Sequence, residues 1–376
     1  MKPDLSIIIP CYNCEKTVGE TVDSCYKQGL GDSFEIIMVD DGSTDNTCTV
    51  IKNIAEKYKN VRYIFHEKNL GGGAARNTAV DNAAADVIFC IDSDDSLPDD
   101  TLDRMYSRLI EKKCDGMTFS GAYSFSKKKE NHRLTDFGLD TEKPITLDSL
   151  FSGKPWMVGE YFMYTKESFY TAGGYPTDHS FDTQGFGFKY NARGLKAYVC
   201  PKTFMYKRQF GDQISYFERA YNSGEFSVNY YLILLEHIEI FSPKIKEMIL
   251  NYDIFAKNTL QNNIIADLQK EYRKDKVCFF SGTKENTLGH SPESEYQKNN
   301  FKTALSLFIS SYRNYRNMYF DGMRYLYGAS NNSKMTIDNY KHLIKENSIT
   351  PHGHDSLRPT LLARAKRKIK KYLPKQ

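Results

Sequence analysis

Three carboxylates lie within four positions at the end of an apolar run, where residues 89–91 lead into Asp92, Asp94 and Asp95. Like charges held this close raise one another's pKa, so the cluster is costly without a counter-charge. A hard divalent cation is the simplest counter-charge, and it can take its remaining ligands from water and substrate phosphate. The cluster therefore predicts a metal site. The alternative is a solvated acidic turn that caps a helix.

Three groups upstream could act on a phosphorylated nucleotide. Tyr12 offers a ring to a base, and Asp41 can accept a hydrogen bond from a base such as uracil. Arg76 comes just after the glycine run 71–73, where free backbone N–H groups at a helix start suit a diphosphate. Each feature alone has a plainer explanation, namely a turn and cap at Asp41 and close strand–helix packing at the glycines. Their order along the chain favours one nucleotide-binding crevice.

Alternating apolar runs and amphipathic segments must position these groups. The predicted strands are residues 5–10, 34–39, 61–66 and 86–91, and the predicted helices are residues 14–28, 44–58, 71–85 and 101–112. Strands that alternate with helices form right-handed crossovers and a mainly parallel sheet with helices on both faces. Because ligands bind beyond the carboxyl ends of such strands, the groups above are expected to meet at one edge.

The pattern changes after residue 116. Strands are predicted at residues 117–126, 157–164 and 197–206, with a polar segment at 127–142. Beyond about residue 215 the chain is predicted to be helical, at residues 216–235, 243–272, 302–327 and 336–347, with a polar loop at 281–300.

Residues 5 to about 115 resemble the nucleotide-binding half of the family 2 glycosyltransferases, which have the GT-A fold. The matching segments are SIIIPCYN at 6–13, VDDGSTD at 39–45, NLGGGAARN at 69–77 and DSDD at 92–95. The resemblance implies an α/β, Rossmann-like GT-A domain followed by a mostly α-helical C-terminal region. The expected divisions are a GT-A domain at 1–215 (nucleotide-sugar half 1–115, acceptor half 116–215), a helical region at 216–350 and a basic amphipathic tail at 351–376.

The family's functional residues carry over onto matching positions of this chain. Contacts with a nucleotide-sugar donor are thereby expected from Pro10, Tyr12, Asn13, Asp41, Gly72, Arg76, Asp92 and Ser93. Asp94, together with Asp92, is expected to hold Mn²⁺ or Mg²⁺ as the cofactor.

Inverting sugar transfer needs a base that takes the proton from the acceptor hydroxyl, and a carboxylate can do this. In the family the base follows a Gly-Gly-aromatic turn and precedes a helix, and residues 173–175 supply that turn here. Asp182 is the predicted base, with Asp178 and then His179 as alternatives, because the usual Glu-Asp pair is absent. Asp182 could instead be a helix cap. Arg208 stands near a position where relatives often place a His, and it could contact the diphosphate.

The expected activity is metal-dependent, inverting transfer from a nucleotide-sugar, with a UDP-sugar favoured, to a glycan or lipid-linked acceptor in bacterial surface-polysaccharide synthesis. The Gln-x-x-Arg-Trp motif of the family's processive synthases is absent, which favours single transfers. Trp156 could pack under the sheet or stack on a sugar ring. The alternatives are a non-catalytic nucleotide-sugar-binding module and a nucleotidyltransferase, which would need a basic glycine-rich loop after the first strand. A dinucleotide dehydrogenase is disfavoured, because its G-x-G-x-x-G should also follow that strand.

Charge is uneven along the 376 residues, whose formal net charge is +4. Eight basic residues and no acid lie between 358 and 376, which leaves the remainder mildly acidic and argues against a nucleic-acid partner. Residues 358–373 place apolar side chains on one helical face and basic ones around it, which predicts contact with an anionic membrane surface. The alternative is a solvated or docked tail.

The eight cysteines, Cys90, Cys200 and Cys278 among them, are interpreted as small buried hydrophobes in a reducing compartment. Cys11-x-x-Cys14 could be redox-active or half of a zinc site, but no second C-x-x-C completes one. The resemblance also disfavours these roles, because it assigns the same strand end to the nucleotide. With no signal-peptide pattern and no apolar run near the ~18 residues of a membrane span, the expected location is cytoplasmic, peripheral at the inner membrane face if the tail binds.

Overall fold

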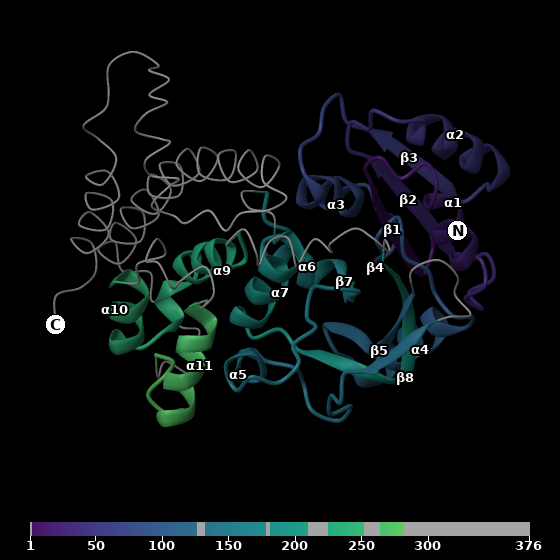
Figure 1. The fold of residues 1–376 in the computed structure, drawn as a ribbon. Helices are drawn as coiled ribbons and strands as arrows, with labels where there is room; N and C mark the ends of the chain where they lie inside the picture. The colour runs from purple at the N-terminus through teal and green to yellow at the C-terminus, as the bar shows by residue number, and fades with distance from the viewer. Residues whose placement is uncertain (1, 126–131, 178–180, 210–224, 252–263, 282–376) are drawn as a thin grey trace, which may run out of the picture. The chain divides into compact units, whose positions relative to one another are not determined.

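The computed structural model describes residues 2–125, 132–177, 181–209, 225–251 and 264–281, which are drawn in colour in Figure 1. The chain divides into two compact units, Met1–Tyr216 and Phe217–Gln376. The basic tail and the helices predicted at 302–327 and 336–347 lie outside the described residues, as does nearly all of the loop predicted at 281–300.

Within its described residues, the first unit is built on an eight-stranded sheet. Its strands are β1 (Leu5–Cys11), β2 (Phe34–Asp40), β3 (Val61–Phe65), β4 (Val87–Cys90), β5 (Gly116–Phe125), β6 (Arg133–Asp136), β7 (Met163–Thr165) and β8 (Ala197–Arg208). The helices are α1 (Val18–Cys25), α2 (Thr47–Lys57), α3 (Gly72–Asp81), α4 (Thr101–Lys112), α5 (Leu147–Phe151), α6 (Lys166–Ala172) and α7 (Asp182–Ala192).

The sheet has the strand order β3-β2-β1-β4-β7-β5-β6, with β8 paired to β5. The strands β3, β2, β1 and β4 are mutually parallel, as the alternation of strands and helices predicts. Beyond β4 the sheet is mixed, because β7 runs antiparallel to both β4 and β5 while β8 runs parallel to β5. The fold is therefore α/β, with a parallel half that carries the four motif segments and a mixed half that follows it.

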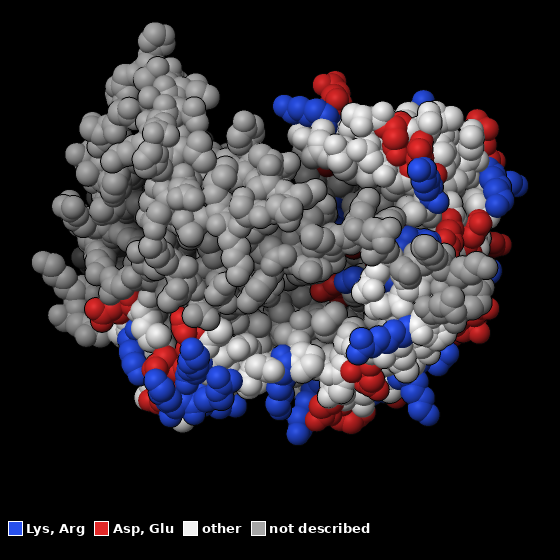
Figure 2. Space-filling view, in the orientation of Figure 1, with Lys and Arg blue, Asp and Glu red and all other residues white. Residues whose placement is uncertain are grey.

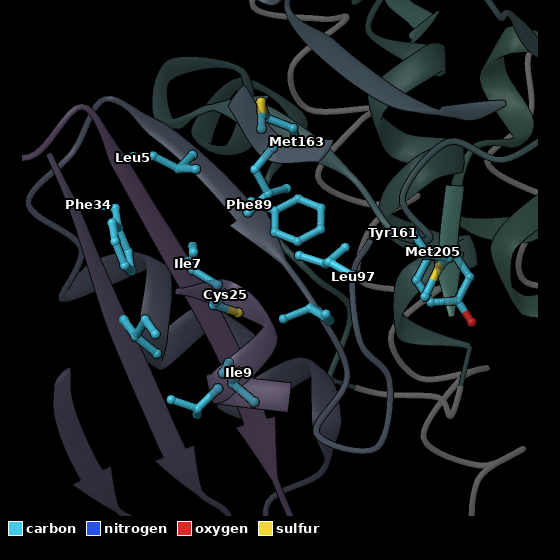
Figure 3. Packing of buried hydrophobic residues seen from close by; sticks show 14 of the residues in the cluster. Leu5, Ile7, Ile9, Cys25, Phe34, Phe89, Leu97, Tyr161, Met163 and Met205 are labelled. Carbon is cyan, nitrogen blue, oxygen red and sulfur yellow. The ribbon is translucent and has the colours of Figure 1, made fainter. Parts of the chain in front are cut away.

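Both faces of the sheet are covered by helices, which explains the unbroken apolar runs of its central strands. Along β1, Ile7 and Ile9 point into one core with α1, α2 and α4, whereas Ile8 points into a second core with α3, α6 and α7. Figure 3 shows part of the first core, including Ile7, Cys25 of α1 and Phe89 of β4. This alternation fixes the register, so the strand ends hold their polar groups at one edge of the sheet.

Two predictions about the first unit are wrong in detail. The strand predicted at 157–164 is reduced to β7, because Gly159 and Tyr161 adopt left-handed backbone angles (φ 91° and 49°) that interrupt an extended run. The polar segment predicted at 127–142 contains the exposed strand β6, which pairs with β5. An edge strand with one solvated side lacks the apolar pattern that would predict it.

The second unit is helical in the residues that the structure describes. Its elements are α9 (Glu225–Glu236), the short 3₁₀ helix η2 (Ile238–Ile240), α10 (Pro243–Asn251) and α11 (Ile264–Lys274). Phe241, Tyr272 and Phe279 pack with their rings in edge-on contact and are buried. Cys278, which was expected to be buried, is exposed, because its neighbour Phe279 takes the inward position. No helix among the described residues is long and apolar enough to cross a membrane.

Acidic and basic side chains are interspersed on the described part of the face shown in Figure 2. Some charged side chains in the described residues are paired locally: Glu142 contacts both Arg108 and Lys112, and Glu271 contacts both Lys244 and Lys274. Exposed pairs of this kind are screened by water, so they add little to the stability of the fold.

Candidate active site

The carboxyl ends of β1, β2 and β4 meet at one edge of the sheet. Cys11 pairs with Asp40, the N–H of Asp41 donates to the Cys11 carbonyl at 2.8 Å, and the N–H of Ile91 donates to the Ile8 carbonyl at 3.1 Å. The segments that follow these strands are therefore neighbours, although 80 positions separate the first from the last. This is the edge at which α/β sheets bind ligands.

The turn after β1 presents Tyr12 to solvent. Its next residue, Asn13, has φ 50°, a left-handed conformation that asparagine tolerates better than most residues. The side-chain oxygen of Asn13 accepts from the backbone N–H of Thr44 at 2.8 Å, and the backbone N–H of Asn13 donates to Ser43 Oγ at 2.9 Å. Tyr12 is thereby held 49% exposed, open to a planar ligand. Pro10 at the strand end is half-buried.

Asp41 is buried, and its carboxylate holds the glycine-rich loop. Its two oxygens accept from the backbone N–H groups of Leu70 at 2.9 Å and Gly71 at 2.8 Å, and Oδ1 also lies 2.7 Å from Nδ1 of His66. The other ring nitrogen of His66 lies 3.0 Å from Oγ1 of Thr78. These contacts give Asp41 a role in shaping the loop, and its predicted contact with a base stays a prediction. Sequence reasoning missed His66, whose only signal is its place at the end of the strand predicted at 61–66.

The glycines that follow allow helix α3 to approach the segment before α7. A Cβ on Gly73 would lie 2.0 Å from the Pro176 carbonyl oxygen, and one on Gly72 would lie 2.8 Å from Oδ2 of Asp182. Asn77 ties the two parts together, because its side-chain amide donates to the Tyr175 carbonyl and accepts from the Tyr175 N–H, both at 2.9 Å. The glycine run therefore does pack closely, but against the turn before α7 and not against a strand, and this packing brings the predicted base to the edge of the sheet.

We expect Gly73→Ala to lower both stability and activity, because the added methyl would overlap a backbone carbonyl that cannot move without shifting the turn before Asp182. Thermal unfolding and turnover measure the two effects. Gly19→Ala in α1 is the matched control, since nothing lies within 4 Å of the added atom, and it should raise stability by up to about 1 kcal/mol. Equal behaviour of the two variants would contradict the packing argument.

Arg76 connects the carboxylate cluster to the predicted base. Its Nη2 lies 2.5 Å from Asp92 Oδ1, and its Nη1 lies 2.6 Å from Asp182 Oδ2. The guanidinium is buried, whereas Asp92 is 41% exposed and Asp182 is 15% exposed. Burial raises the pKa of Asp182, Arg76 opposes this shift, and Asp92 adds to it. Asp182 is also the first residue of α7 and accepts from the N–H of Thr183 at 2.9 Å, but the N-cap residue is Phe181 and no side chain caps this helix, so the structure does not give Asp182 the alternative role of a helix cap.

The carboxylates after β4 repel one another, as their spacing predicts. Burial and the negative charge of Asp92 raise the pKa of Asp94 to about 6. Burial together with the charges of Asp94 and Asp92 raises the pKa of Asp95 well above its ordinary value. Ser93, which lies between Asp92 and Asp94 in the sequence, is half-buried. Such a cluster gains stability from an added positive charge.

Two basic residues at the end of β8 lie beside this cluster. The Arg208 backbone N–H donates to Asp95 Oδ1 at 2.8 Å, its Nε donates to the Asp94 carbonyl at 3.1 Å, and its Nη2 pairs with Glu20. Lys207 pairs with Glu160 at 3.1 Å, and although burial opposes its charge, Glu160 and Asp95 raise the pKa of Lys207. Lys207 and Glu160 were not predicted, because only the fold brings them to the acidic loop. The predicted contact of Arg208 with a diphosphate stays a prediction.

The residues present fit a divalent cation held by few protein ligands. In the part of the chain that the structure describes, no group of three or more His, Cys, Asp or Glu side chains is arranged to hold a metal ion. Mg²⁺, which keeps several waters and binds through one or two carboxylates and substrate phosphates, does not need such a group. The mutual repulsion of Asp92, Asp94 and Asp95 provides the charge that such an ion would neutralise.

Residues 6–173 match the model of glycosyl transferase family 2. These residues form a family 2 glycosyltransferase domain. The match covers all four segments at the sheet edge and stops just after α6. Asp182 and Arg208 lie beyond it, so their assignment depends on the geometry described above.

Named relatives of this domain are bacterial glycosyltransferases. An uncharacterized glycosyltransferase of Haemophilus influenzae is 35% identical over 156 residues, which cover 42% of this chain and 60% of that protein. The poly(ribitol-phosphate) beta-glucosyltransferase of Bacillus spizizenii is 39% identical over 113 residues, which cover 30% of this chain and 18% of that protein. The putative teichuronic acid biosynthesis glycosyltransferase TuaG of Bacillus subtilis is 32% identical over 120 residues, which cover 32% of this chain and 47% of that protein. The chain thus spans less than two thirds of each of these relatives.

Solved structures of S. aureus TarS share the fold. TarS 1–349 superimposes with a TM-score of 0.51 at 22% identity, over 73% of this chain and 75% of that chain. TarS 1–349 in complex with UDP superimposes with a TM-score of 0.52 at 20% identity, over 81% of this chain and 79% of that chain. This likeness supports the GT-A fold of the glycosyltransferase domain.

The sequence also suggested a sugar-stacking role for Trp156 and two alternative bases, Asp178 and His179. Trp156 is half-buried and packs against Gly187 of α7, and its Nε1 donates to Asn191 Oδ1 at 2.8 Å. The structure therefore gives Trp156 the packing role, and stacking on a sugar stays untested. The alternative bases Asp178 and His179 lie outside the described residues.

Proposed function

We propose that this protein is a metal-dependent, inverting and non-processive glycosyltransferase. It transfers a sugar from a nucleotide-sugar, with a UDP-sugar favoured, to a hydroxyl of a glycan or lipid-linked acceptor in surface-polysaccharide synthesis. The observation that carries the proposal is the Arg76 bridge. Arg76 contacts both Asp92 of the nucleotide half and Asp182, which lies 106 positions beyond Arg76 in the chain. This contact supports a donor site and a base at the same edge of the sheet.

Asp182 has the features that a general base requires. Burial raises the pKa of Asp182, which makes its carboxylate a better proton acceptor than an exposed aspartate, and the charge of Arg76 favours the ionised form. In the proposed reaction an acceptor oxygen forms a bond to the anomeric carbon, the bond from that carbon to the diphosphate breaks, and Asp182 takes the hydroxyl proton. Attack on the face opposite the leaving group inverts the anomeric configuration.

The remaining charged residues suit the leaving diphosphate. Arg76 is a planar donor that can exchange a carboxylate for a phosphate, and Arg208 contacts the acidic loop through the Asp94 carbonyl. Asp94, with Asp92, would hold Mn²⁺ or Mg²⁺, which would neutralise the charge that develops on the diphosphate.

Donor and acceptor classes are proposed from the relatives. TarS 1–349 has been solved in complex with UDP, which supports UDP as the nucleotide here. The names of the Bacillus relatives refer to poly(ribitol-phosphate) and teichuronic acid, which supports an acceptor in a surface polysaccharide. Contact of residues 358–373 with an anionic membrane remains part of the proposal.

A thermal-shift screen of UDP, GDP, dTDP and CMP, each with and without Mn²⁺, tests the donor site. We expect UDP with Mn²⁺ to stabilise the protein by about 2.7 kcal/mol at a concentration about 100 times its Kd. The shift should disappear in Asp94→Ala and remain in Asp103→Asn, which removes an exposed carboxylate on α4.

A shift without any release of UDP from UDP-sugars in the presence of acceptor extracts would favour the non-catalytic binding module. No shift with any nucleotide would contradict the proposed donor site.

A further inference from the structure

The side chain of His66 connects the end of β2 to helix α3. Its Nδ1 lies 2.7 Å from Oδ1 of Asp41, which follows β2, and its Nε2 lies 3.0 Å from Oγ1 of Thr78 on α3. Only 10% of the His66 side chain and 3% of the Asp41 side chain are exposed. A polar contact so well shielded from water is strong, and it can fix the orientation of both groups.

The partners of His66 determine how its ring nitrogens are used. An ionised carboxylate only accepts hydrogen bonds, so Nδ1 donates its hydrogen to Asp41. In the neutral ring, Nε2 then accepts a hydrogen bond from the hydroxyl of Thr78. Both polar ends of the ring are therefore engaged, and an apolar side chain at position 66 would take a partner from Asp41 and from Thr78.

Asp41 keeps one acceptor position for a ligand. A carboxylate offers about four such positions, two on each oxygen. Oδ1 accepts from the N–H of Leu70 and from His66, whereas Oδ2 accepts, among the described residues, only from the N–H of Gly71. The direction of the remaining position on Oδ2 depends on the torsion that turns the carboxylate. This torsion is soft in an isolated side chain, so the three donors set it.

The same contacts hold the glycine-rich loop between the turn after β2 and α3. A Cβ on Gly42 of that turn would lie 2.6 Å from the backbone nitrogen of Asn69, so the turn and the loop already touch. Thr78, the partner of His66 on α3, follows Arg76 by two positions. His66 thereby ties together the strand end, the loop and the helix that carries Arg76.

We propose that His66 is a positioning residue for nucleotide binding. It turns the Asp41 carboxylate so that Oδ2 keeps its remaining acceptor position for an N–H of the base, and it does not touch the nucleotide itself. A uracil ring supplies such an N–H, whereas cytosine presents a lone pair at the same ring position and is disfavoured. The inference rests on the proposed function, because it names the residue that prepares the proposed donor site.

Substitutions that replace one ring nitrogen at a time test this role. The side-chain amide of Asn can take the place of Nδ1 and that of Gln the place of Nε2, so His66→Asn keeps the contact with Asp41 and His66→Gln keeps only that with Thr78. We expect His66→Gln and His66→Phe to bind UDP with Mn²⁺ about tenfold more weakly than the wild type. His66→Asn should restore most of the affinity and the preference for UDP over CDP. In turnover assays with UDP-sugars, the KM for the donor should rise while kcat is kept.

Hydrogen exchange of the nucleotide-free chain gives a readout that is independent of the proposed function. The two loop amides that donate to Asp41 should exchange faster in His66→Phe and His66→Gln, and close to the wild-type rate in His66→Asn. Ser6→Ala is the matched control, because it removes a donor to another buried carboxylate, that of Glu35 at 2.6 Å, near the start of β1. This control should lower stability and leave the UDP affinity and the loop amides unchanged.

Two results would overturn the proposal. Wild-type UDP affinity in His66→Gln would show that the contact with Asp41 does not prepare the site. Equal losses in His66→Asn and His66→Gln would show that the ring only fills space, and this comparison stays decisive if His66→Phe does not fold. If the wild type bound no nucleotide, the proposed function would fail, and hydrogen exchange would still decide whether His66 holds the loop through Asp41.

Discussion

Asp182→Asn should reduce turnover by about 10²–10⁴-fold while leaving donor affinity nearly unchanged, because the variant loses the proposed proton acceptor. An amide oxygen can still accept a hydrogen bond from Arg76, so the packing between α3 and α7 should persist. Release of UDP from the donor measures turnover, and titration with UDP and Mn²⁺ measures donor affinity.

The pH dependence gives a second readout of the same residue. The base must be deprotonated, so kcat/KM should fall as the pH drops through the pKa of Asp182, which is raised by burial above that of an ordinary aspartate. Asp103→Asn should retain the wild-type turnover and the same fall of kcat/KM at low pH, because it removes only an exposed carboxylate. Wild-type turnover in Asp182→Asn would rule out Asp182 as the base and direct attention to Asp178 and His179.

Asp94→Asn should abolish metal-dependent activity and yet make the metal-free protein more stable at pH 8. The pKa of Asp94 is raised to about 6, so the folded protein holds this proton more tightly than the unfolded chain does. The stabilisation from this group is present below the pKa of the unfolded chain and is lost as the pH rises through about 6. The neutral amide avoids this loss, which amounts to about 3 kcal/mol at most.

Chemical denaturation of the metal-free protein at pH 4 to 8 measures this effect. The stability difference between Asp94→Asn and the wild type should grow with pH over this window, and Mn²⁺ should stabilise the wild type alone. Asp103→Asn should follow the wild type in every condition. A loss of stability in Asp94→Asn at pH 8 would show that the carboxylate serves the fold, and would contradict its assignment as a repelled group that awaits a cation.

The parallel half of the fold and the candidate residues on it follow from local sequence patterns. Unbroken apolar runs such as residues 5–10 can be buried only between two helical layers, and the polar groups that follow such runs must appear at one edge. Tyr12, Asp41 and Asp94 could therefore be placed at a common site before any contact was known. The spacing of Asp92, Asp94 and Asp95 also determined their mutual repulsion, because three positions along one chain cannot move far apart.

Long-range packing brings further groups to that edge from distant parts of the chain, and these could not be predicted. Arg76 reaches Asp182 because glycines 72 and 73 let α3 approach the turn before α7, and no local pattern encodes such a contact. His66 contacts Asp41, and Lys207 reaches the acidic loop, for the same reason. The direction of β7 and the exposure of Cys278 likewise follow from long-range packing. Local periodicity reports only which face of an element is buried, whereas its partner is chosen by the whole fold.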